Sequence, residues 1–137
     1  SFYGTNEMLN LLKDIQPDLI VLAGFLWLFP EKIVEAFPDK VINLHPALLP
    51  KFGGKGMYGA NVHKAVVEQK EEKTGITIHF VNEVYDDGKI IAQFETELKP
   101  TDTVEDVASK INELEMEHFP KVINELLFPE RYDTNGN

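Results

Sequence analysis

The chain contains no cysteine, and this absence excludes disulfide bridges and thiolate chemistry. A reducing compartment suits such a chain, and we expect it in the cytoplasm. Arginine is scarce as well: Arg131 is the only one, and 13 basic against 23 acidic residues give a formal net charge of −10. A chain this acidic is poorly suited to bind nucleic acid or anionic membranes. We therefore expect small-molecule partners, with no nucleic acid and no membrane.

Long apolar runs are also missing. The longest covers residues 19–30 and is well short of the roughly 20 residues that a membrane-spanning helix needs. No cysteine pair or close histidine pair has metal-ligand spacing, so we expect no bound metal. A length of 137 residues with 43% hydrophobic content suits one globular domain. We expect residues 1–129 to form a partial domain and residues 130–137 a flexible tail.

The hydrophobic periodicity predicts both helices and strands. The predicted helices cover residues 5–15, 31–36, 60–69 and 103–127, and the predicted strands cover residues 19–23, 41–44, 77–81 and 90–98. The first strand is continuously apolar, which is typical of a parallel strand covered on both faces. The turn sequence at residues 86–88 predicts an antiparallel pairing of the last two strands. The expected fold class is α/β, a three-layer sandwich with a mostly parallel sheet.

An amide and an imidazole lie at the end of the second predicted strand. Asn43 and His45 are two residues apart, so their side chains project from the same face of that strand. Pro46 then ends the strand, because it has no N–H group to donate. In open α/β sheets this rim binds ligands. A carbonyl-polarising amide beside a proton-carrying imidazole suits acyl transfer; a strand end with one hydrogen-bonded histidine is the alternative.

Several blocks of the sequence resemble the phosphoribosylglycinamide formyltransferases, a family of folate-dependent enzymes. These blocks are residues 18–24 (DLIVLAG), 43–54 (NLHPALLPKFGG), 74–81 (TGITIHFV) and 85–93 (YDDGKIIAQ). The resemblance extends over about residues 18–123 and implies the formyltransferase fold. It also implies an enzyme of purine biosynthesis, a monomer or homodimer. Such an enzyme transfers a formyl group from 10-formyltetrahydrofolate, its co-substrate, to the amine of glycinamide ribonucleotide.

The same resemblance assigns roles to particular side chains. Asn43 would hydrogen-bond the formyl oxygen and the oxyanion formed from it, and His45 would carry protons beside it. Asp86 would fix the histidine and an ordered water. Asp87 stands where relatives have glycine, so a shift of one residue would exchange the two aspartates. Glu115, on the last helix, would approach the amine of the ribonucleotide.

A folate pocket is implied where two loops come together. By position, its lining would comprise Leu22, Leu26, Trp27, Leu28, Val34, Val81, Asn82 and Asp86. The large apolar residues at 25–29 suit a pteridine slot, with ordinary core packing as the alternative. Trp27 stands where many relatives have arginine. Leu49-Pro50 is expected to be cis from the family, and His79 is expected to be a buried structural histidine.

Two regions depart from the family. The glycine-rich segment 53–59 is longer than in most relatives, and it would serve as a lid or a surface loop. The family's N-terminal phosphate-binding glycine loop has no counterpart here, and the chain does not begin with methionine. We therefore expect N-terminal Rossmann-like units to be missing and this fragment to be inactive by itself. The alternatives are another folate-dependent formyltransferase, a 10-formyltetrahydrofolate hydrolase, or a non-catalytic folate-binding fragment.

Overall fold

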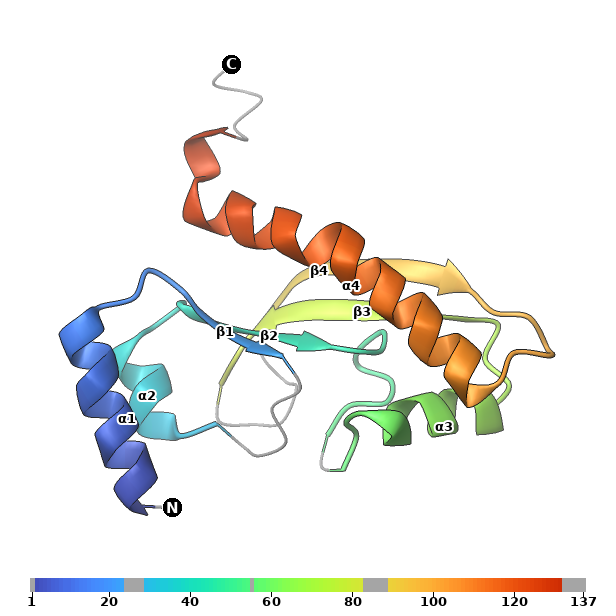
Figure 1. Cartoon of the computed structure of the whole chain (residues 1–137), viewed down its shortest axis with the longest axis horizontal. Coiled ribbons are helices and arrows are strands. Elements are labelled where there is room, and N and C mark those ends of the chain that lie inside the picture. The colour runs from blue at the N-terminus through green and yellow to red at the C-terminus, as the bar shows by residue number, and fades with distance from the viewer. Residues whose placement is uncertain (1, 24–28, 55, 83–88, 132–137) are drawn as a thin grey trace.

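The computed structural model describes residues 2–23, 29–54, 56–82 and 89–131. Its helices are α1 (Phe2–Ile15), α2 (Glu31–Ala36), α3 (Ala60–Glu68) and α4 (Val104–Leu127), followed by the short 3-10 helix η1 (Pro129–Arg131). Its strands are β1 (Ile20–Ala23), β2 (Val41–His45), β3 (Lys73–Phe80) and β4 (Ile90–Glu97) (Figure 1). All eight elements predicted from the periodicity are therefore present.

The four strands form one sheet in the order β1-β2-β3-β4. The first pair is parallel, and the pairs β2–β3 and β3–β4 are antiparallel. This arrangement confirms the α/β fold, and within the described residues the parallel part of the sheet is the β1–β2 pair. The predicted pairing of the last two strands is also confirmed. The turn that joins them, with Asp86 and Asp87, lies outside the described residues.

Strand β3 begins at Lys73, earlier than the predicted start at residue 77. The residues that extend it pair with β4, as Lys73 with Glu97 and Gly75 with Glu95. Lysine and glycine have low strand propensity, so Lys73 and Gly75 do not favour a strand, although the β-branched Thr74 and Ile76 do. Pairing with β4 overrides that propensity.

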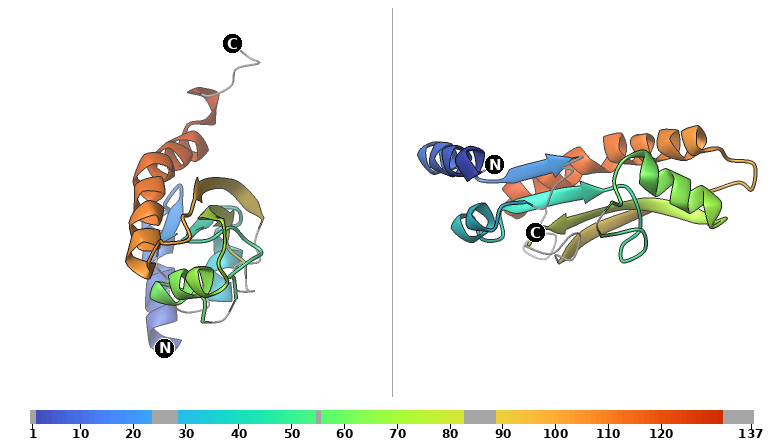
Figure 2. Two further views of the ribbon diagram at one scale, coloured as in Figure 1. Left: turned by 90° about the vertical axis from the view of Figure 1, so that its right-hand side faces the viewer. Right: turned by 90° about the horizontal axis from the view of Figure 1, so that it is seen from below.

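The two faces of the sheet have separate cores, which the alternation along β2 explains. Ile42 and Leu44 point to the face covered by α3 and α4, whereas Val41 points to the opposite face, where α2 packs. The first cluster contains Ile42, Leu44, Ala47, Val62, Val66, Ile76, Ile78, Val107, Ile111 and Val122. The second contains Phe29, Ile33, Phe37 and Val41, with Leu9 and Leu12 of α1 packed against it. The helices on the two faces give the layered architecture (Figure 2).

Strand β1 is less covered than its apolar sequence predicts. Its residues alternate between half-buried and exposed, and the side chain of Val21 is 41% exposed. Ile20 and Leu22 pack against the second core cluster, while Val21 faces the other way. The prediction of burial on both faces is wrong for the described residues, because there the face with Ile20 and Leu22 packs against a core cluster and the Val21 side chain does not.

Helix α4 is long and begins with a complete capping box, as its sequence indicates. The Thr103 hydroxyl accepts the Asp106 N–H at 3.2 Å, and the Asp106 carboxylate accepts the Thr103 N–H at 2.9 Å. Val107 and Ile111 are then buried against the sheet. None of the described helices is long and apolar enough to span a lipid bilayer.

We predict that Gly75→Ala destabilises the fold by about 1–3 kcal/mol, as overpacked sites do. A Cβ at Gly75 would collide with the backbone carbonyl of Phe94 and lie 2.6 Å from Cδ2 of Leu48. Urea denaturation of both proteins gives the difference. Glu95→Ala, at the paired position on β4, is the control and should cost at most about 0.5 kcal/mol, since Glu95 makes only an exposed ion pair with Lys73. Equal stability of Gly75→Ala and the parent would contradict this packing argument.

Candidate active site

A row of polar side chains crosses the sheet on the face opposite α4. Asn43 pairs with His79, His45 pairs with Thr77, and Thr77 pairs in turn with Gln93. Residues directly opposite one another in a sheet share a face, so these five side chains form one group, the polar row. His45, Thr77 and His79 are each at most 3% exposed. Buried polar groups need hydrogen-bond partners, and these partners define the site.

The Asn43 amide is held by His79. Its Nδ2 lies 3.2 Å from Nε2 of His79, while Nδ1 of His79 lies 2.9 Å from the Phe80 carbonyl oxygen. A carbonyl oxygen only accepts, so Nδ1 must carry a proton and donate it. In the neutral ring Nε2 is then the acceptor, and Nδ2 of Asn43 donates to it.

The other atom of the same amide is unsatisfied. Oδ1 of Asn43 is buried and has no hydrogen-bond partner among the residues that the structure describes. Leaving a buried acceptor unpaired costs about 1–3 kcal/mol, so native structures rarely do so without a reason. The Asn43 amide thus has an acceptor without a described partner on the strand face that it shares with His45.

His45 is anchored to the loop that follows β2. Its Nε2 lies 2.7 Å from the Phe52 carbonyl oxygen, to which it donates. Phe52 adopts a positive φ of 57°, a conformation that is uncommon outside glycine. The loop backbone thus places the proton of neutral His45 on Nε2 and leaves Nδ1 as the basic nitrogen of the ring.

Thr77 fixes the segment between His45 and this loop. Its hydroxyl donates to the Ala47 carbonyl at 2.7 Å and accepts the Leu49 N–H at 3.0 Å. Nε2 of Gln93 donates to the same hydroxyl and to the Leu49 carbonyl, each at 2.9 Å. The Leu49-Pro50 peptide bond is cis, as expected. This network holds residues 47–50 against the sheet.

The residues predicted to line the folate pocket are only partly placed. Leu22, Val34 and Val81 come together, packed against the second core cluster. Asn82 belongs to the described part of the chain, and the Val81 N–H donates to the Val41 carbonyl at 2.9 Å. The remaining predicted residues, Leu26, Trp27, Leu28 and Asp86, lie outside the described residues. The three placed apolar side chains are consistent with core packing as well as with the wall of a slot.

Glu115 is half-buried on α4, the helix that covers the opposite face of the sheet. Burial raises the pKa of its carboxyl group above the usual range. Among the described residues, no recorded contact joins Glu115 to Asn43 or His45. His63, on α3, is also buried, with its Nδ1 unpaired among the described residues, and burial lowers its pKa.

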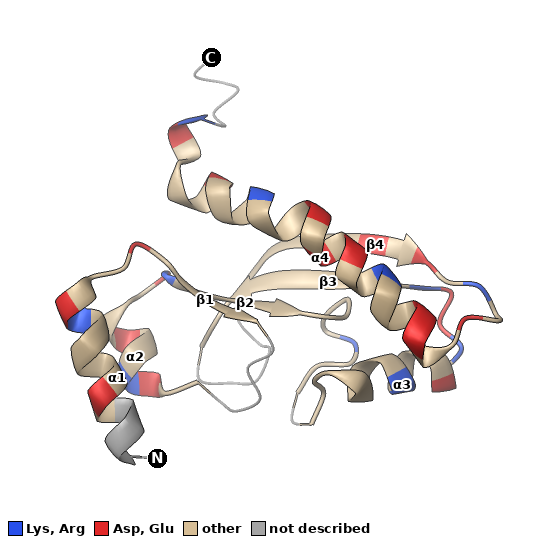
Figure 3. Cartoon of the chain, viewed as in Figure 1, with Lys and Arg blue, Asp and Glu red and all other residues tan. Residues whose placement is uncertain are grey.

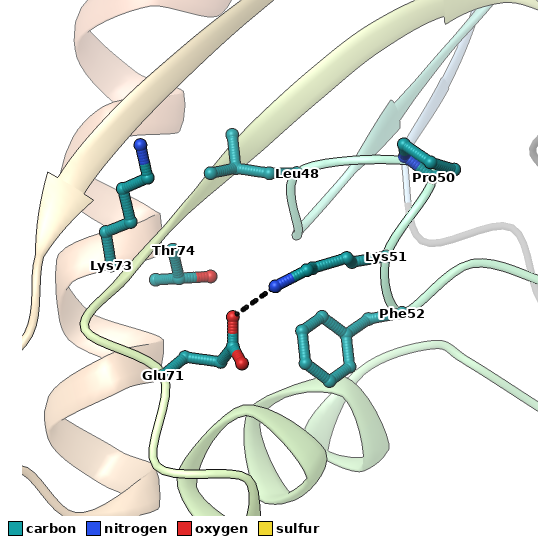
Figure 4. A pocket seen from close by; sticks show the side chains of 7 residues that line it. All are labelled: Leu48, Pro50, Lys51, Phe52, Glu71, Lys73 and Thr74. Carbon is teal, nitrogen blue, oxygen red and sulfur yellow. Dashed lines mark hydrogen bonds and ion pairs between the residues drawn. The ribbon is translucent and has the colours of Figure 1, made fainter.

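A pocket of about 280 Å³ lies beside the loop that anchors His45. It is lined by Leu48, Pro50, Lys51, Phe52, Glu71, Lys73 and Thr74 (Figure 4). Lys51 and Glu71 form an ion pair of 3.0 Å within it. None of the five side chains of the polar row lines this pocket, so it is separate from that row.

Charged residues are concentrated away from the polar row. Neither β1 nor β2 contains Asp, Glu, Lys or Arg, and the charged positions in Figure 3 are mostly on the helices and loops. The described residues also contain no group of three His, Cys, Asp or Glu side chains that could hold a metal ion. Within the described part, the chemistry of the site therefore depends on amide, hydroxyl and imidazole groups.

Comparison with known proteins identifies the family. The formyl transferase family pattern matches residues 3–123. A chloroplastic phosphoribosylglycinamide formyltransferase of Arabidopsis thaliana is 45% identical over 118 residues, covering 86% of this chain and 40% of the relative. The enzyme of the same name from Haemophilus influenzae is 37% identical over 114 residues, covering 83% of this chain and 51% of the relative. This chain belongs to the formyl transferase family.

Solved structures agree with this assignment. A phosphoribosylglycinamide formyltransferase from Bacillus halodurans superimposes with a TM-score of 0.79 at 34% identity, covering 88% of this chain and 60% of that one. A formyltetrahydrofolate deformylase from Pseudomonas syringae also superimposes with a TM-score of 0.79, at 25% identity. The match covers 90% of this chain and 40% of that one. The chain thus spans about half the length of the relatives that it matches.

We predict that Thr77→Val destabilises the protein by about 2–3 kcal/mol, because it leaves the buried Leu49 N–H without an acceptor. The direct measurement is hydrogen exchange, in which the Leu49 amide should lose its protection. Thr77→Ser is the matched control, since it keeps the hydroxyl, and it should keep that protection. Unchanged protection in Thr77→Val would show that another group holds the segment.

We predict that Glu115→Gln raises the melting temperature at about pH 7 more than at about pH 4. A raised pKa in the folded state means that the fold disfavours the ionised carboxylate. The resulting loss of stability begins above the ordinary pKa of the unfolded chain and grows as the pH rises through the raised pKa of the folded state. Thermal melts of both proteins at the two pH values test this. Glu113→Gln, at an exposed position on the same helix, is the control and should show no such difference.

Proposed function

We propose that the protein carrying this chain transfers a formyl group from 10-formyltetrahydrofolate to the primary amine of glycinamide ribonucleotide, in purine biosynthesis. Membership of the formyl transferase family and the names of its relatives support this reaction. The observation that carries the proposal is the Asn43 amide. It lies beside His45 on one strand face, with an oxygen that has no partner among the described residues.

The proposed roles follow from the reaction. The amine attacks the formyl carbon, and the carbonyl oxygen becomes an oxyanion in a tetrahedral intermediate. An N–H of Asn43 is suited to stabilise this charge, because a fixed donor is worth most where charge develops. The amine must lose a proton while the folate nitrogen gains one, and the C–N bond to folate then breaks. Imidazole suits both proton transfers.

His45 would act through Nδ1, because Nε2 donates to the Phe52 carbonyl. A side chain held at one nitrogen keeps its other nitrogen in a defined direction, as proton transfer requires. We propose Asp86 as the carboxylate that orients a water and, once Nδ1 of His45 has taken up a proton, holds the imidazolium. This role comes from the resemblance to the family, since Asp86 lies outside the described residues. Asp87, the next residue, is the alternative for this role.

We propose that the folate co-substrate binds against Leu22, Val34, Val81 and Asn82, together with residues 26–28. The packing of Leu22, Val34 and Val81 around one apolar cluster supports a shared wall on the face of β1 and β2 where α2 packs. No metal is needed for this chemistry. Glu115 on α4 would approach the amine of the ribonucleotide; this role comes from the resemblance to the family alone. We propose that the protein binds small molecules, that it is a monomer or homodimer, and that it acts in the cytoplasm.

The length of the chain limits what it can do by itself. It covers 40% of the plant relative and 60% of the Bacillus halodurans structure, so those proteins contain a large further part. We propose that this fragment has little activity alone, and that residues 1–129 act as the folate-binding and catalytic half of a longer domain.

A hydrolase is the specific alternative. The deformylase from Pseudomonas syringae superimposes as well as the Bacillus halodurans transferase, with a TM-score of 0.79 for both. The fold therefore does not separate amine from water as the acceptor. Product analysis with and without glycinamide ribonucleotide separates the two acceptors. Formate released without the ribonucleotide supports the hydrolase, and formylated ribonucleotide supports the transferase. A folate-binding protein without catalysis would give neither product.

We predict that Asn43→Ala lowers kcat about 10²–10³-fold, as the loss of an oxyanion donor does. We expect His45→Ala to lower kcat by about 10²–10⁴-fold. Both are measured by formyl transfer in the protein at its natural length. Asn61→Ala is the control, because Asn61 is an exposed amide that donates to the Gly56 carbonyl in the glycine-rich loop. Near-parental kcat in both site variants would refute the proposed roles.

A further inference from the structure

His79 is a buried titratable group that the proposed reaction does not use. It lies in the interior of β3, 2% exposed, directly opposite Asn43 in the register of β2 and β3. A buried histidine at this position could simply fill space in the core. Its two hydrogen bonds, to Asn43 and to the Phe80 carbonyl, indicate a specific contact with the site.

The two nitrogens of His79 have different roles, and the backbone sets them. The Phe80 carbonyl requires a proton on Nδ1, so Nε2 of the neutral ring presents a lone pair to Asn43. If the Asn43 amide were turned over, Oδ1 would face that lone pair and the two acceptors would repel. The 3.2 Å contact therefore selects one of two orientations of the amide.

We propose that His79 is a positioning residue, which orients the Asn43 amide for the reaction; this inference rests on the proposed function of Asn43. One N–H of the amide is held by His79. The second N–H is directed to the formyl oxygen, and Oδ1 accepts an N–H of the attacking amine. The buried Oδ1 without a described partner is the acceptor that this arrangement requires.

The physical need for such a residue lies in the asparagine side chain. The terminal torsion of an asparagine is broad and roughly two-fold, so an unrestrained amide occupies both orientations. Only one of them places a donor toward the oxyanion and an acceptor toward the amine. If this orientation is fixed before the substrates bind, the free energy of ordering the amide does not add to the activation free energy.

Two substitutions separate positioning from core filling. In His79→Asn the shorter amide keeps a donor near the Phe80 carbonyl but does not extend to Asn43. In His79→Gln the longer side chain brings a carbonyl oxygen to the former position of Nε2, where it can accept from Asn43. Both variants are polar and smaller than histidine, and circular dichroism and thermal melting establish that each is folded.

We predict that His79→Asn lowers kcat about 10- to 100-fold, a loss typical of a misplaced catalytic group, with the KM for folate within about threefold. His79→Gln should recover at least tenfold of that loss. In the Asn43→Ala background, His79→Asn should lower kcat by less than about twofold, because the group that it positions is gone. The measurements use the protein at its natural length.

The outcomes distinguish the two proposals. If Asn43→Ala leaves kcat intact, the proposed function of Asn43 fails. If Asn43→Ala lowers kcat but His79→Asn does not, or His79→Asn costs the same in the Asn43→Ala background, only the positioning role is overturned. Nitrogen-15 NMR gives a readout without turnover: it should show a proton on Nδ1 of His79, and an Nε2 resonance that shifts in Asn43→Ala. A proton on Nε2 alone in the neutral ring would also overturn the positioning role.

Discussion

The pairing register between β2 and β3 is the constraint on which the site depends. It places His79 opposite Asn43 and Thr77 opposite His45, so each side chain on β2 with a proposed catalytic role has a polar neighbour on β3. A slip of one residue would turn every side chain of one strand to the other face. The apolar residues Ile42, Leu44, Ile76 and Ile78 prevent this, because they must face α3 and α4. The same packing that stabilises the core therefore aligns the site.

The neighbours on β3 act through different parts of the chain. His79 contacts the Asn43 side chain, whereas Thr77 holds the backbone at Ala47 and Leu49. The backbone then continues to Phe52, whose carbonyl accepts from His45. Asn43 is thus positioned by a side chain and His45 by a main-chain group. These are the two side chains to which we assign the charge stabilisation and the proton transfer that an acyl transfer requires.

Local patterns were sufficient to predict the elements but not their contacts. The periodicity predicted the helices and strands, and the two-residue spacing placed Asn43 and His45 on one face. The roles of His79, Thr77 and Gln93 escaped prediction because the β2–β3 and β3–β4 register depends on distant residues. The start of β3 depends on this register as well, since Lys73 and Gly75 have low strand propensity and pair with β4. The apolar sequence of β1 predicts burial on both faces, but an apolar strand can also lie at the edge of a sheet with one face exposed.

The link between Phe52 and His45 has a consequence for how this sequence can change over time. The acceptor is a carbonyl oxygen that every amino acid carries, so the identity of the side chain at position 52 is not what the histidine requires. What must persist is a backbone able to adopt a positive φ, which glycine and asparagine tolerate more readily than phenylalanine does. Mutational drift in this loop can therefore alter its surface and its length while the imidazole keeps its anchor.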